Sequence, residues 1–350
     1  GIGQSINGAR IWIRIGRMSF QPAELSKVLL AVFFASYLVA NRDNLALAGR
    51  KVLWMSLPRA RHLGPLFIVW GVSIGVLVLQ KDLGSSVLLF GLFVVVLYVA
   101  TDRPSWLLIG AALFLPAAWF AATHLNHVQQ RINGWLHATD NAVYNAAGGS
   151  WQLLTGMFGM STGGLMGAGW GKGSPTLVTF ANSDFIFASL GEELGLTGTL
   201  VLLMLYLVLI QRGLRTAVLL RDGFGKLLAV GLSFAVALQI FVVIGGVTRL
   251  IPLTGLTLPF LAYGGSSLIA NWIILALLLR LSDAARRPAT HAPRIIDTAE
   301  LPLSLRRRVQ DAGAEESMAQ AADDAPAGGA PADAGGYTSP SAAPGFGDLA

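Results

Sequence analysis

The sequence has no cysteine and few charged residues. Of its 350 residues, only 13% are charged, against roughly 25% in a typical soluble domain. The missing cysteines exclude a disulfide scaffold and a zinc–thiolate site, and the scarcity of charge argues against a soluble enzyme. Hydrophobic residues make up 54% of the chain. The composition therefore favours an integral membrane protein.

Long apolar segments recur along the chain as far as residue 280. A helix that crosses the hydrocarbon core of a membrane needs about 20 mostly apolar residues, with a range of ~17–25. We therefore predict an all-α fold, a polytopic membrane helix bundle of about seven spans. The predicted spans are residues 22–40, 64–80, 83–100, 105–122, 196–211, 227–247 and 258–280.

Basic residues between the spans predict the orientation, because lysine and arginine accumulate on the cytoplasmic side of a membrane. If the spans alternate, the basic segments 41–63, 101–104, 212–226 and 280–287 all fall on one side. We expect that side, and the C-terminus with it, to be cytoplasmic. Gly1 then lies outside, and we expect an odd number of spans before it in the full protein.

Three arginines near the start of the chain run against this rule. Arg10, Arg14 and Arg17 fall on the expected outer side, where we interpret them as contacts for an anionic group. Elsewhere, basic charge in so apolar a body indicates membrane orientation rather than nucleic-acid binding. No nucleic-acid partner is therefore expected.

Two segments stand apart from the spans. Residues 123–195 form a long loop, expected outside, whose tryptophans and tyrosines favour an ordered structure and whose short amphipathic stretches suit the membrane face. Residues 286–350 are rich in Ala, Pro, Gly and Asp and carry six arginines against nine acidic residues. Such a segment cannot bury a core. We thus predict a membrane domain over 1–285 and a disordered cytoplasmic tail over 286–350.

A few ionisable residues fall on or near the outer side. Glu24 and Lys27 share a helix face at spacing i, i+3. They form either a self-neutralising ion pair or a functional pair, since charges in a membrane are costly. Asp82 either caps a turn or takes part in the chemistry. Asp184 precedes an apolar run, and the residues alone leave a helix cap and a catalytic base equally open.

Common catalytic motifs are missing. The glycine-rich segment 156–173 is not a phosphate loop, because Gly173 follows Lys172 where a Walker A motif needs Ser or Thr. The sequence has no HExxH motif and no Ser-His-Asp order.

Seven short strings nevertheless resemble one known family, the SEDS glycosyltransferases of bacterial cell-wall synthesis, which include RodA and FtsW. In order, they cover about residues 1–285, and the details most resemble the actinobacterial RodA branch. The strings are NGARIWI (7–13), QPAELSK (21–27), KDLGSS (81–86), SDFIF (183–187), GEELG (191–195), PLTGLTLP (252–259) and YGGSS (263–267). Members of the family have ten spans, so the resemblance implies that three precede this chain.

The resemblance also implies an activity, the polymerisation of lipid II into glycan strands on the outer face of the cytoplasmic membrane. It assigns the essential carboxylate to Asp184. Glu24, Lys27 and Asp82 match further positions that the family needs, and Arg131 matches an arginine of the external loop. The sequence departs from the family pattern at Lys81, Trp151 and Ser183.

The implied glycosyl transfer needs only one carboxylate, as a general base. A general base would take the proton from the acceptor's 4-hydroxyl, and the leaving lipid pyrophosphate needs no acid, in contrast to the two-carboxylate glycosidases. A single displacement would invert the anomeric centre. Cations must stabilise the pyrophosphate, and Lys27, Arg10, Arg131 or a divalent cation (Mg²⁺ or Mn²⁺) could supply them.

The resemblance implies partners as well. They are lipid II, a class B penicillin-binding protein as transpeptidase, and other elongation or division machinery. Two other functions stay open, a transporter that flips lipid II and a non-catalytic division or elongation scaffold.

Overall fold

The computed structural model describes residues 3–6, 9–15, 18–41, 51–52, 55–56, 60–79, 82–146 and 148–287. The chain divides into two units, Gly1–Arg287 and Pro288–Ala350. The second unit, and with it the prediction of a disordered tail, lies outside the described residues.

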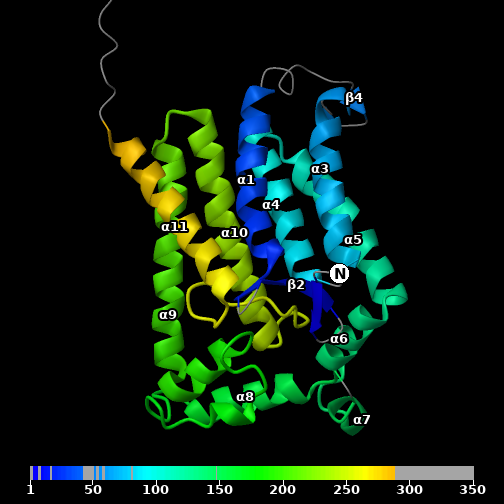
Figure 1. Cartoon of the computed structure of the whole chain (residues 1–350), viewed down its shortest axis with the longest axis vertical. Coiled ribbons are helices and arrows are strands. Elements are labelled where there is room, and N and C mark those ends of the chain that lie inside the picture. Colours follow the sequence, from blue (N-terminus) through cyan, green and yellow to red (C-terminus); the bar gives the residue numbers. More distant parts are fainter. Residues whose placement is uncertain are drawn as a thin grey trace, which may run out of the picture. The chain divides into compact units, whose positions relative to one another are not determined.

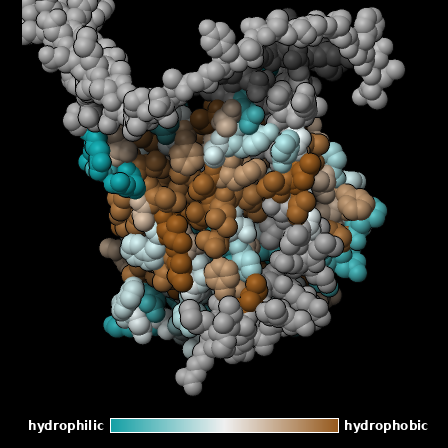
Figure 2. All heavy atoms as spheres, turned by 45° about the horizontal axis from the view of Figure 1, so that its top comes forward, coloured by the Kyte–Doolittle hydropathy of each residue, from teal (hydrophilic) through white to brown (hydrophobic). Residues whose placement is uncertain are grey.

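Seven long apolar helices form the first unit (Figure 1). They are α1 (Pro22–Ala40), α3 (Ala60–Leu79), α4 (Leu83–Thr101), α5 (Ser105–His124), α9 (Ile186–Leu219), α10 (Gly223–Val247) and α11 (Gly265–Arg286). All except α3 are found long and apolar enough to cross a membrane, and α3 covers the predicted second span. In Figure 2 hydrophobic residues occupy the middle of the visible face, with hydrophilic residues toward its margins. The predicted membrane helix bundle is confirmed.

Two helices differ from their predicted spans. Helix α9 has 34 residues, because the helical backbone continues through polar residues at both ends of its apolar part. It changes direction at Gly195, whose φ of 68° and ψ of −170° are not helical. Helix α11 begins at Gly265 instead of 258, because residues 251–264 form an irregular loop that contains Pro252 and Pro259.

The chain begins with strands that the sequence analysis did not predict. Strands β1 (Gly3–Ile6), β2 (Ala9–Ile15) and β3 (Met18–Phe20) pair as an antiparallel sheet in the order β1-β2-β3. A second pair, β4 (Lys51–Val52) and β5 (Met55–Ser56), is also antiparallel.

Helix ends follow local chemistry. Pro22 stands at the first turn of α1, where a missing backbone N–H costs nothing. Asp82 caps α4 by accepting a hydrogen bond from Ser85 N at 3.0 Å, and Asp222 caps α10 in the same way from Gly225 N at 2.8 Å.

The core centres on α10, which packs against α1, α4, α9 and α11. Leu232 of α10, Leu92 of α4 and Ala35 of α1 are fully buried. The rings of Phe34 (α1) and Phe93 (α4) meet edge to face with centroids 5.5 Å apart. This close contact fixes α1 and α4 against each other, and both carry candidate site residues.

The predicted external loop is largely helical. It contains α6 (Asn126–Leu136), α7 (Asn141–Tyr144), α8 (Trp151–Gly163) and the 3-10 turn η1 (Pro175–Leu177). Helices α6 and α8 lie at one end of the bundle, opposite the turn between α9 and α10 (Figure 1).

The glycine-rich segment after α8 packs directly on the backbone of α9. Ala168 N donates to Glu192 O at 2.9 Å, and Leu196 N donates to Gly164 O at 2.9 Å. A Cβ atom at Gly167 would collide with the carbonyl of Glu193. The glycines therefore permit close backbone approach, and this contact fixes the part of α9 around its break at Gly195.

Candidate active site

The loop of residues 251–264, between α10 and α11, contacts Arg131, Glu24 and the segment that carries Asp184. Its Leu253 carbonyl accepts a hydrogen bond from Arg131 Nη1 at 2.7 Å. Its Thr257 hydroxyl lies 3.5 Å from Glu24 Oε1. At the far end of the loop, Tyr263 N donates to Asn182 O at 2.7 Å. Three separate parts of the chain thus meet at this loop.

Gly255 of the same loop stands beside both Arg131 and Asp184. A Cβ atom built on Gly255 would lie 3.6 Å from Arg131 Nη2 and 3.7 Å from Asp184 Oδ2. Its φ of +78° is in the left-handed region that favours glycine. The structure therefore brings the predicted catalytic carboxylate and the predicted external-loop arginine to one point.

Asp184 is not the cap of a helix. Helix α9 begins at Ile186, and its N-cap residue is Phe185, with no side-chain capping hydrogen bond. The cap alternative left open by the sequence is thus wrong, and the carboxylate serves no local backbone purpose there.

Burial shifts the pKa values of both Asp184 and Arg131. It raises the pKa of Asp184 to about 6, although the nearby Arg131 charge and a hydrogen bond with Ser183 act in the opposite direction. Burial also lowers the pKa of Arg131, against the charges of Asp184 and Asp82. A carboxylate with a pKa near 6 is ionised at neutral pH and is a stronger base than an ordinary aspartate.

Asp82 lies within electrostatic reach of Arg131. Its Oδ1 caps α4, which confirms the turn-capping alternative. Its Oδ2 is buried without a hydrogen-bond partner among the described residues. One carboxylate oxygen is therefore engaged in the helix cap, and the other is not.

Glu24 and Lys27 form the ion pair that their spacing indicated, with 2.6 Å between Oε2 and Nζ. The Lys27 ammonium also donates to Gln239 Oε1 on α10 at 2.7 Å and to Asn271 Oδ1 on α11 at 3.4 Å. All four side chains are at least 95% buried. Buried charges persist only when they are paired and hydrogen-bonded, and this pair meets both conditions.

The polar network extends to the loop of residues 251–264. Gln239 Nε2 donates to Thr257 O at 2.8 Å, and the Thr257 hydroxyl donates to Ser267 Oγ at 2.8 Å. The void beside Glu24 and Lys27 measures only about 10 Å³, so in this conformation it admits no sugar or phosphate.

Sequence analysis missed Gln239, Asn271, Thr257 and Gly255. The first two had a usable signal, because an amide side chain in an apolar span is costly and marks either a function or a buried partner. Gly255 had none, since its positive φ and its two neighbours are features of the tertiary structure.

A second pair of contacts that the sequence analysis missed fixes α6 in place. Trp135 Nε1 donates to Arg249 O at 3.0 Å, and Arg249 Nε donates back to Trp135 O at 2.9 Å. Arg249 has a φ of 61°. These reciprocal bonds hold the helix that carries Arg131.

Four basic residues from the sequence analysis are not placed. Arg10 and Arg14 lie in β2, but their side chains are outside the part of the chain that the structure describes, and so are Arg17 and Lys81 altogether. No three His, Asp or Glu side chains gather into a metal site among the described residues.

Comparisons of the chain with protein families, curated proteins and solved structures all find relatives. The family model for FtsW, RodA and SpoVE, described as "Cell cycle protein", matches residues 1–287. The chain is 51% identical over 288 residues to "Peptidoglycan glycosyltransferase RodA" of Mycobacterium tuberculosis, which covers 82% of this chain and 61% of that protein. It is 33% identical over 284 residues to "Probable peptidoglycan glycosyltransferase FtsW" of Geobacter metallireducens, covering 81% and 72%.

Two solved structures are also similar to this chain. One, titled as a peptidoglycan synthase complex that coordinates polymerization and crosslinking, matches with a TM-score of 0.63 and 28% identity, over 82% of this chain and 77% of that one. The Thermus thermophilus rod shape determining protein RodA matches with a TM-score of 0.53 and 25% identity, over 82% and 73%. The chain thus spans about three fifths of the mycobacterial relative and about three quarters of the solved chains.

Proposed function

This chain belongs to the FtsW, RodA and SpoVE family of cell cycle proteins, and from that premise we propose that it polymerises lipid II into glycan strands. The names of its relatives as peptidoglycan glycosyltransferases support this activity. The observation that carries the proposal is the meeting of Asp184 and Arg131 at Gly255. A base and a cation side by side are what an inverting transfer from a pyrophosphate donor needs.

In the proposed reaction Asp184 takes the proton of the acceptor's 4-hydroxyl. That oxygen forms a bond to the donor's anomeric carbon, while the bond from this carbon to the pyrophosphate breaks. Undecaprenyl pyrophosphate leaves with the bonding electron pair. Because attack and departure occur on opposite faces, the anomeric configuration inverts.

Arg131 is proposed to stabilise the charge that grows on the pyrophosphate. Its Nη1 is held by Leu253 O, which orients the guanidinium beside Asp184. Arg10 and Asp82 are proposed to contact the substrate too, and Mg²⁺ or Mn²⁺ would add positive charge at the pyrophosphate if bound.

Glu24 and Lys27 are proposed to contribute to binding of the substrate's headgroup. The existing hydrogen bonds of Lys27 restrict how it can do so. Three acceptors already surround the Lys27 ammonium. Direct binding of a phosphate therefore requires α1, α10 and α11 to separate, whereas support of the loop of residues 251–264 through Thr257 requires no movement.

The reaction is proposed to occur on the extracellular side of the cytoplasmic membrane, with the C-terminus in the cytoplasm. The support is the position of the arginine- and lysine-rich segment 212–226 at the end of the bundle opposite α6 and α8 (Figure 1). A class B penicillin-binding protein is the proposed partner, since the solved complex couples polymerization to crosslinking.

The test is purified full-length protein with lipid II in detergent. Glycan chains that form without another enzyme establish a polymerase. Lipid II translocation in vesicles without chain formation would instead establish a flippase, and the absence of both activities would indicate a scaffold.

A further inference from the structure

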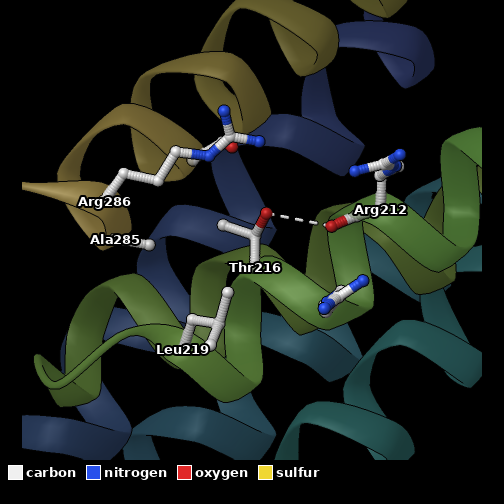
Figure 3. A pocket seen from close by; sticks show the side chains of 7 residues that line it. Arg212, Thr216, Leu219, Ala285 and Arg286 are labelled. Carbon is white, nitrogen blue, oxygen red and sulfur yellow. Dashed lines mark hydrogen bonds between the residues drawn. The ribbon is translucent and has the colours of Figure 1, made fainter.

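A basic pocket lies at the end of α9 and α11 that is opposite the candidate active site. Its cavity measures about 240 Å³. Arg212, Arg215 and Thr216 line it from α9, and Ala285 and Arg286 line it from α11. In Figure 3 the Arg286 side chain extends from α11 toward α9, and Arg212 lies on the other side of Thr216.

The three arginines have no counter-ion in the described part of the chain. No Asp or Glu there pairs with Arg212, Arg215 or Arg286. The nearby carboxylate of Asp283 is engaged by Arg280 at 3.5 Å and Arg287 at 2.6 Å. Three like charges around one cavity repel one another, so an anion in the cavity would relieve the repulsion.

The hydroxyl of Thr216, which also lines the cavity, does not neutralise the arginines. It donates to the carbonyl of Arg212 at 2.9 Å (Figure 3), and its oxygen carries no charge. Arg212 and Arg215 both stand on the last turns of α9, which ends at Leu219. The cations are thus presented from a formed helix.

The surface beside the pocket is apolar. The two helices that line the pocket also expose apolar side chains, such as Val208 of α9 at 52% and Leu279 of α11 at 62%. The apolar run of α9 ends at Ile210, and Gln211, Arg212 and Arg215 follow it, so the last turns of α9 lie at the membrane surface. A ligand here meets arginines in the pocket and exposed apolar side chains on the same two helices.

We propose that this pocket binds the phosphate headgroup of an anionic phospholipid, whose acyl chains lie along the α9–α11 seam. Guanidinium groups form paired hydrogen bonds with phosphate oxygens. Basic pockets between membrane helices are suited to such headgroups. A free phosphate would use the same arginines but would gain nothing from the apolar seam.

The proposal is tested with the full-length protein by native mass spectrometry, with phosphatidylglycerol or phosphatidylcholine added to the detergent. The double variant Arg212→Gln/Arg286→Gln removes two pocket cations. The double variant Arg221→Gln/Arg280→Gln removes the same charge from the same end of the bundle, outside the pocket. We expect one phosphatidylglycerol to bind about 30-fold more weakly in the first variant and with unchanged affinity in the second.

A third variant separates a shaped site from general charge attraction. Ala285→Phe keeps all three arginines and fills the cavity, so it should also abolish binding of this lipid. Equal losses in the two double variants, or full binding in Ala285→Phe, would overturn the proposal. So would inorganic phosphate binding as tightly as phosphatidylglycerol, because the ligand would then be a free anion.

Discussion

The Nζ atom of Lys27 lies 2.7 Å from Oε1 of Gln239, although 212 positions separate the two residues. Each side chain alone is a costly polar group inside an apolar helix. Together with Glu24 they form a network whose members satisfy one another. The network connects α1 to α10 and, through Thr257, reaches the loop that lies beside Asp184.

Replacement of Asp184 by asparagine tests the general base. Asparagine keeps the size of the side chain but cannot accept the proton, so we expect polymerisation to fall by roughly 10²–10⁴-fold. Initial rates of lipid II consumption measure this. Asp140→Asn, which changes an exposed carboxylate in the same segment of residues 123–195, is the matched control and should leave the rate unchanged. A near-normal rate in the folded Asp184→Asn protein would refute the assignment.

The pH dependence follows from the raised pKa of Asp184, about 6. Only the ionised form accepts a proton, so the rate should be constant well above pH 6 and fall about tenfold per pH unit below it. Arg131→Gln removes the charge that lowers this pKa. The acidic limb of the rate profile should then move to higher pH, whatever the loss in the maximal rate. An unmoved limb would show that a group other than Asp184 controls it.

Removal of Glu24 should destabilise the bundle. Glu24→Ala leaves the buried Lys27 ammonium with only the neutral oxygens of Gln239 and Asn271, and an unpaired buried charge costs about 3–5 kcal/mol. Thermal unfolding in detergent measures the loss. A control at exposed Leu29 on the same helix, Leu29→Ala, should unfold close to the parent temperature.

The charge swap Glu24→Lys/Lys27→Glu separates structure from binding. It restores the pair of charges but places a carboxylate against Gln239 Oε1, so we expect partial recovery of stability and no activity. Full polymerisation by the swapped protein would rule out phosphate binding by Lys27.

A side chain at position 255 should reduce activity. Gly255→Ala forces a residue with a Cβ atom into φ +78°, which costs about 1–2 kcal/mol, and places a methyl group in contact with both Arg131 and Asp184. Gly171→Ala has a similar φ of +71° but nothing within 4 Å of the added atom. We expect comparable losses of stability in the two proteins and a loss of polymerisation only in Gly255→Ala. Equal rates would show that the position of Gly255 is merely structural.

Cysteine labelling tests the orientation in the membrane. These 350 residues contain no cysteine, so one introduced at Ser5 or at Ser56 is distinguishable from the parent protein. In the full-length protein a membrane-impermeant thiol reagent added outside should label the first and not the second. The opposite pattern would place Asp184 in the cytoplasm and contradict an extracellular polymerase.

The sequence by itself determined the helix bundle and the main candidate residues. Hydropathy is a property of each segment, because every span must bury its own backbone polar groups in lipid. The seven predicted spans therefore correspond to seven helices, and the i, i+3 spacing of Glu24 and Lys27 sufficed to predict their pairing. The strands before α1 carry no comparable signal and were missed.

Only the tertiary structure decided which of these residues contact one another and how each contact changes their properties. The sequence left Asp184 open between cap and base, because a cap depends on where α9 begins, and α9 begins at Ile186 with Phe185 as its N-cap residue. The raised pKa of Asp184 depends on burial by distant helices and on the charge of Arg131. The loop of residues 251–264 joins them through contacts such as Arg131 Nη1 to Leu253 O, 122 residues apart. Hydrogen bonds over such separations arise from helix packing, which no local pattern encodes.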